Sequence, residues 1–202
     1  MFTIYLLVPY LMAGVSLTII LVNRIRVAIG LLVVQYVLAF TISVSVQPLR
    51  SIGARLIGGV IVCLILITAE RRFTQGVAFI HTDALPRSTW FRLITSIIVI
   101  LVAWALAIQN ENAIASIDSN VFRGAVFCVC TGLLMIGLYQ TPLEAALGML
   151  TLLIGFDLFY GGIEPSLAII ALLVSLQLII SLSTSYIMSI AHHATFIEEG
   201  RR

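Results

Sequence analysis

The chain has 202 residues, of which 61% are hydrophobic and 10% are charged, and its net charge is +2. Soluble domains carry roughly 45–50% apolar and about 25% charged residues, so this composition excludes a soluble globular domain. The abundance of apolar residues also excludes intrinsic disorder, and the small net charge argues against a nucleic-acid partner. The composition therefore predicts an integral membrane protein that is surrounded by lipid for most of its length.

Seven apolar segments are long enough, or nearly so, to cross a bilayer as helices, because a core of about 30 Å needs roughly 20 residues at 1.5 Å each. Their continuous apolar character favours helices over barrel strands. We therefore expect an all-α polytopic membrane protein whose seven transmembrane helices lie near residues 3–22, 27–46, 52–69, 93–109, 121–139, 142–160 and 166–190. The third segment is the weakest, since it is short and begins beside Arg55, which would have to extend to the interface. Six spans is the alternative.

The arginines predict the orientation, because short cytoplasmic loops are enriched in basic residues. With seven spans, one side of the membrane receives Arg24, Arg26, Arg71, Arg72, Arg87, Arg92, Arg201 and Arg202. The other side receives Arg50, Arg55 and Arg123. We expect the N-terminus outside and the C-terminus in the cytoplasm, in a bacterial or organellar inner membrane or a plasma membrane. The long connection 70–92 either lies along the cytoplasmic interface or docks on a partner subunit.

The chain also resembles itself, which predicts an internal repeat. Residues 23–40 and 141–158 both follow a cytoplasmic turn and place a small-apolar-Gly triplet one turn into the membrane. Four spans separate equivalent helices, so the two three-helix units, spans 1–3 and 5–7, point the same way. We expect a first unit at 1–69, an interfacial loop at 70–92, a connecting helix and outer loop at 93–120, a second unit at 121–190 and a tail at 191–202.

Asn23-Arg24 and the triplets Ala28-Ile29-Gly30 and Ala146-Leu147-Gly148 carry a resemblance to a known family. A three-helix unit of this kind resembles the small K-type subunit of respiratory complex I and the C-type subunit of multisubunit cation/proton antiporters. The doubled form, with seven helices in about 200 residues, is similar to component E of the hydrogenase-4 and formate hydrogenlyase group.

The departures from that family define the function that the resemblance implies. The K-type family carries a buried glutamate two residues after the glycine of its second helix, where this chain has Leu32 and Leu150. The third helices, around 56–69 and 166–187, contain no acid. The resemblance therefore implies an accessory or structural subunit of an ion-translocating complex that is not catalytic on its own. Two alternatives stay open: a small self-contained transporter or channel, and a scaffold in another complex, for example a photosynthetic one.

Three polar residues within the spans are the candidates for an ion relay. Asp157 is the one carboxylate within an apolar segment, and it is either part of such a relay or an acid that is hydrated from outside or bonded to a neighbouring helix. Gln35 and Gln177 are mid-membrane amides, which either join helices by hydrogen bonds or line a polar path.

Small residues predict close helix packing at five positions. Gly124, Cys128 and Gly132 recur every four residues, and Gly148 and Gly155 lie two turns apart. Such stripes let another helix approach closely and favour other membrane subunits, together with lipid, as the partners.

No cofactor or metal site is expected from the sequence. His81, His192 and His193 fall outside the spans, so no buried histidine is available as a haem ligand. The cysteines form no metal-binding spacing, and motifs for phosphate binding or nucleophilic catalysis are missing. Glu144 follows Thr141-Pro142 and is explained by the capping of a helix N-terminus.

Overall fold

The computed structural model describes residues 2–22, 25–44, 49–74, 89–110, 117–138, 141–164 and 166–199. Within these ranges the protein is all-helical, as predicted. Its seven helices are α1 (Phe2–Leu21), α2 (Ile25–Val44), α3 (Leu49–Thr74), α4 (Thr89–Gln109), α5 (Ser119–Leu138), α6 (Pro142–Ile163) and α7 (Leu167–Glu199). Over the described residues, α2 to α7 are each long and apolar enough to cross a membrane, and α1 has the apolar stretch Leu7–Leu21. These helices are consistent with an integral membrane protein.

Helices α3 and α7 extend furthest beyond the C-terminal ends of the apolar segments that predicted them. Helix α3 continues to Thr74, and α7 continues to Glu199 through most of the expected tail. An apolar segment marks the part of a helix that meets lipid, whereas the backbone hydrogen bonds can continue into water, so hydropathy underestimates helix length. The centre of the expected interfacial loop, 75–88, lies outside the described residues, as does Asn23-Arg24.

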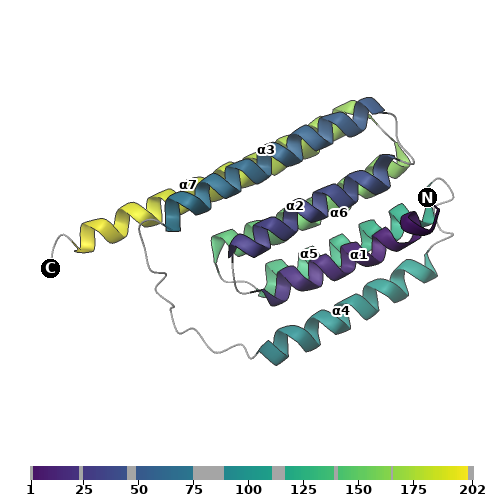
Figure 1. The fold of residues 1–202 in the computed structure, drawn as a ribbon, viewed down its shortest axis with the longest axis horizontal. Coiled ribbons are helices and arrows are strands. Elements are labelled where there is room, and N and C mark those ends of the chain that lie inside the picture. The colour runs from purple at the N-terminus through teal and green to yellow at the C-terminus, as the bar shows by residue number, and fades with distance from the viewer. Residues whose placement is uncertain are drawn as a thin grey trace.

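The helices form two layers that confirm the parallel repeat. Helices α1, α2 and α3 make one layer, and α5, α6 and α7 make the other (Figure 1). Helices at equivalent positions of the two units lie side by side and run in the same direction. Helix α1 packs on α5, α2 on α6, and α3 on α7. The connecting helix α4 covers the edge formed by α1 and α5.

Aromatic side chains hold α4 against this edge. The Trp104 ring of α4 lies 5.2 Å from the Tyr10 ring of α1 and 6.4 Å from the Phe127 ring of α5, measured between centroids. The Tyr10 hydroxyl also accepts a hydrogen bond from Arg123 Nη1 at 3.3 Å. Three helices are therefore joined at one level of the bundle.

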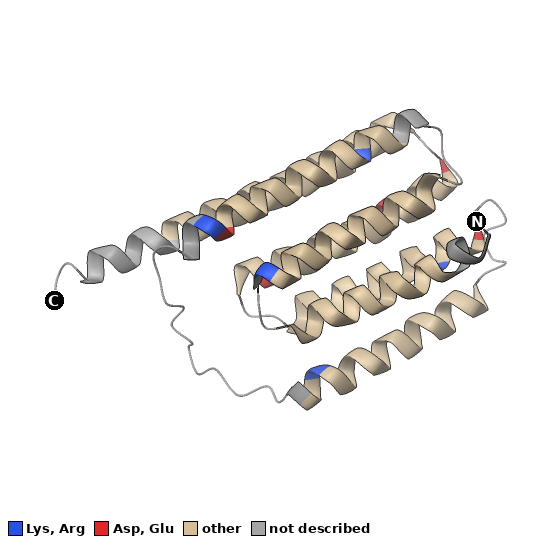
Figure 2. Ribbon diagram, in the orientation of Figure 1, with Lys and Arg blue, Asp and Glu red and all other residues tan. Residues whose placement is uncertain are grey.

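Charged residues gather at the two ends of the bundle, and the long middle carries almost none (Figure 2). At one end Arg26 of α2 donates from Nε to Glu70 Oε1 of α3 at 2.7 Å, which ties two helices of the first layer together. At the start of α6, Thr141 Oγ1 accepts from the backbone N–H of Glu144, and Pro142 occupies the first turn. The capping predicted for Glu144 is confirmed.

The predicted small-residue stripes pack within this chain. A Cβ added to Gly132 would lie 2.6 Å from the backbone nitrogen of Leu152, and one added to Gly155 would lie 2.8 Å from that of Val129. The backbones of α5 and α6 are therefore in direct contact. Cys128 of the same stripe is fully buried. A Cβ added to Gly124 would meet Ile42 and Met12, from the first layer.

Equivalent glycines of the two units provide a test of this packing. We expect Gly148→Ala to lower the free energy of unfolding by about 1–3 kcal/mol, because its Cβ would lie 2.9 Å from the backbone nitrogen of Ile136. The matched control is Gly30→Ala, where nothing lies within 4 Å of the added Cβ. It should leave stability unchanged or raise it slightly through helix propensity. Unfolding in mixed micelles with increasing dodecyl sulfate measures both, and equal losses would contradict the packing.

Candidate functional site

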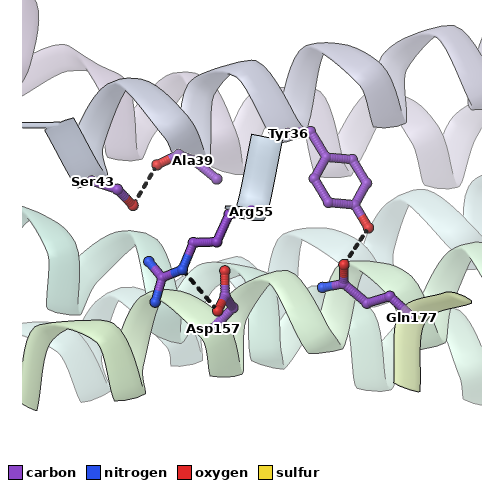
Figure 3. A network of polar contacts seen from close by, with 6 residues as sticks. All are labelled: Tyr36, Ala39, Ser43, Arg55, Asp157 and Gln177. Carbon is purple, nitrogen blue, oxygen red and sulfur yellow. Dashed lines mark hydrogen bonds and ion pairs between the residues drawn. The ribbon is translucent and has the colours of Figure 1, made fainter. Parts of the chain in front are cut away.

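An ion pair connects the two layers inside the membrane-spanning part of the bundle. Arg55 Nε of α3 lies 3.1 Å from Asp157 Oδ1 of α6 (Figure 3). The two side chains are only 9% and 15% exposed. Arg55 is six residues from the start of α3 and Asp157 six residues from the end of α6, so each lies about 9 Å inside its helix end.

This geometry corrects the expectation that Arg55 extends to the interface. The side chain instead turns inward toward Asp157, because an oppositely charged partner within hydrogen-bonding distance offsets the cost of burial in an apolar environment. Of the two interpretations of Asp157, the observed contact is the bond to a neighbouring helix; its role in an ion relay stays a prediction.

A second polar contact lies deeper in the bundle. Tyr36 Oη of α2 donates a hydrogen bond to Gln177 Oε1 of α7 at 3.2 Å (Figure 3). The ring of Tyr36 packs on Gly59 of α3, where an added Cβ would lie 2.8 Å from Tyr36 Cδ1. The next residue toward the N-terminus, Gly58, allows Val174 of α7 an equally close approach. The Gly58-Gly59 pair therefore lets α3 approach α2 and α7 at the same level.

These polar groups line a cleft of about 430 Å³ between α2 and α3, with α6 and α7 as its floor. Ser43, Arg55 and Asp157 stand toward the end of the bundle where α6 meets α7, and Tyr36 and Gln177 lie further along. The remaining walls are apolar apart from the Cys63 thiol. The site therefore combines a long apolar cleft with an internally neutralised pair of charges.

The structure brings together two of the three predicted relay residues. Asp157 and Gln177 line the cleft, but Gln35 lies in the separate interface of α2 with α1 and α5. There the Gln35 amide donates to Ser16 Oγ at 3.0 Å and to Cys128 Sγ at 3.3 Å. Gln35 is fully buried and joins three helices.

Comparison with models of protein families, with curated proteins and with solved structures finds no match to this chain. The chemistry of the site therefore has to be argued from its own residues. Sequence reasoning missed Tyr36 and the pairing of Arg55 with Asp157. One signal was present for the pair: the two opposite charges stand near the same predicted face of the membrane, in the third and sixth predicted spans.

A double-mutant cycle tests the ion pair. Arg55→Met or Asp157→Leu alone leaves an uncompensated charge, so we expect each to destabilise the protein by about 3–5 kcal/mol. The double variant Arg55→Met/Asp157→Leu removes both charges and should recover most of that loss. The free energy of unfolding in mixed micelles is the measurement. A double variant as unstable as the sum of the two single variants would show that the side chains are not coupled.

Proposed function

We propose that the protein is an accessory, structural membrane subunit of a multisubunit ion-translocating complex, and that it does not itself carry the proton relay. One observation supports this most: among the described residues, Asp157 is the one carboxylate in the interior of an apolar span, and it is held by Arg55. Its contact, 3.1 Å from Oδ1 to Arg55 Nε, links α6 to α3. The pair is better suited to joining helices than to passing protons.

The other polar groups support the same function. Gln35 joins α2 to α1 and α5, and Tyr36 and Gln177 join α2 to α7. Each group is used in a contact between helices, and Gln35 belongs to a different interface from the other two. A transporter or channel needs polar groups that follow one another across the membrane, and these contacts do not form such a series.

The kind of complex is proposed from the sequence resemblance alone. A duplicated K-type unit implies a complex-I-like, hydrogenase-like or antiporter-like assembly, in which this chain packs beside larger ion-translocating subunits and lipid. The charge distribution supports an external N-terminus and a cytoplasmic C-terminus in a bacterial or organellar inner membrane or a plasma membrane.

Mild-detergent extraction from the native membrane tests this assembly. We expect the protein to migrate on a native gel with large antiporter-like subunits, identified by mass spectrometry of the band. Migration as a monomer or small oligomer would contradict the proposal and favour a self-contained transporter. Pigment-binding proteins in the same band would favour the photosynthetic scaffold.

The absence of a relay role is tested in the assembled complex. The charge-free double variant Arg55→Met/Asp157→Leu should assemble and translocate ions at the rate of the unmodified complex, because the pair passes no protons. Ion uptake into vesicles, normalised to the amount of assembled complex on a native gel, is the measurement. Normal assembly with a reduced translocation rate would instead assign Asp157 to the relay.

A further inference from the structure

The cleft between α2 and α3 is long enough to hold a hydrocarbon chain. Its lining extends along α3 from Ile52 to Ile67, which is about 22 Å of helix. The volume of about 430 Å³ lies in the range of small-molecule sites. A partner helix about 10 Å in diameter would need roughly 1,700 Å³ over the same length, so it is too large to enter.

The cleft opens sideways, toward the surface that faces lipid. Val37 of α2 and Leu56, Val60 and Leu64 of α3 line it and are also exposed on the outside of the bundle. In a membrane this surface meets the hydrocarbon core, so a molecule that enters the cleft comes from within the bilayer.

The polar end of the cleft selects against a charged head. Arg55 and Asp157 neutralise each other, so the pair offers no net charge to attract an ion. Both lie within the apolar spans Ile52–Arg71 and Pro142–Ile163, so a charged head that reached them would lose part of its contact with water. A hydroxyl, ketone or ester oxygen can form hydrogen bonds at this level without carrying a charge into the hydrocarbon core.

We propose that this cleft binds an uncharged membrane amphipath with one long hydrocarbon chain, its oxygen-bearing head beside Arg55, Asp157 and Ser43. The chain runs along α3 past Tyr36 and Gln177, whose hydroxyl and amide oxygen are already hydrogen-bonded to each other. An apolar chain therefore passes them without breaking that bond. Binding at this site does not depend on the complex to which the protein belongs.

Photo-crosslinking tests the site. The purified protein in phosphatidylcholine nanodiscs is irradiated with methyl palmitate that carries a diazirine midway along its chain, and crosslinked peptides are mapped by mass spectrometry. We expect labelling to concentrate on the cleft-lining segments 33–40 of α2 and 56–67 of α3. A phosphatidylcholine with the same diazirine chain should label the lipid-facing surface evenly, including α4. Even labelling by both probes would overturn the proposal.

Two valine variants show whether the label depends on the cleft. Val60→Trp fills it and should reduce labelling of the cleft by methyl palmitate about tenfold, equivalent to about 1.4 kcal/mol of binding. Val34→Trp on α2 is the matched control, because Val34 is outside the cleft and similarly exposed, 44% against 50% for Val60. It should leave the labelling unchanged. Equal labelling of both variants would overturn the proposal.

Competition distinguishes two sources of an uncharged chain. Unlabelled hexadecanol represents straight-chain lipids, and geranylgeraniol represents isoprenoids. Displacement of the methyl palmitate label by either compound supports the site, and the stronger competitor identifies the class of chain. Failure of both to displace the label at saturating concentration would overturn the proposal.

Discussion

Burial of charge within lipid is the constraint on which this bundle depends. Arg55 and Asp157 come from different layers, and each would be costly in the hydrocarbon region without a nearby opposite charge. Their pairing fixes the position of α3 relative to α6 along the helix axes, because a shift of one helical turn, about 5.4 Å, would separate the charges. The contact therefore constrains how the two three-helix layers align.

Within each layer, neighbouring helices are packed to different degrees. Helices α5 and α6 approach so closely that Gly132, Gly148 and Gly155 have no space for a Cβ. Helices α2 and α3 are spaced differently, because the Tyr36 ring stands between their backbones at Gly59. Helices α5 and α6 therefore leave no space between their backbones, whereas α2 and α3 are separated by an apolar cleft that opens toward lipid.

The features that could be predicted from the sequence are those that depend on residues of a single segment. Apolar length predicts the helices, and Thr141 with Pro142 predicts where α6 begins, because both signals act within one segment. The pairing of Arg55 with Asp157 depends on which helices become neighbours in the plane of the membrane, and hydropathy carries no information on that arrangement. The glycine stripes illustrate the same limit: they indicate close packing, but only the fold identifies the covering helix as one of the same chain.

The repeat itself explains why the ion pair can act between the units. With the 118-residue offset that relates 23–40 to 141–158, Asp157 corresponds to Ala39, and Arg55 corresponds to Leu173. Each unit has therefore one charge where the other has an apolar residue. Two identical units could carry both charges in each copy, and either copy could then pair within itself or with the other. A single acid and a single base leave one pairing, between α3 and α6, so divergence of the repeats favours one alignment of the layers.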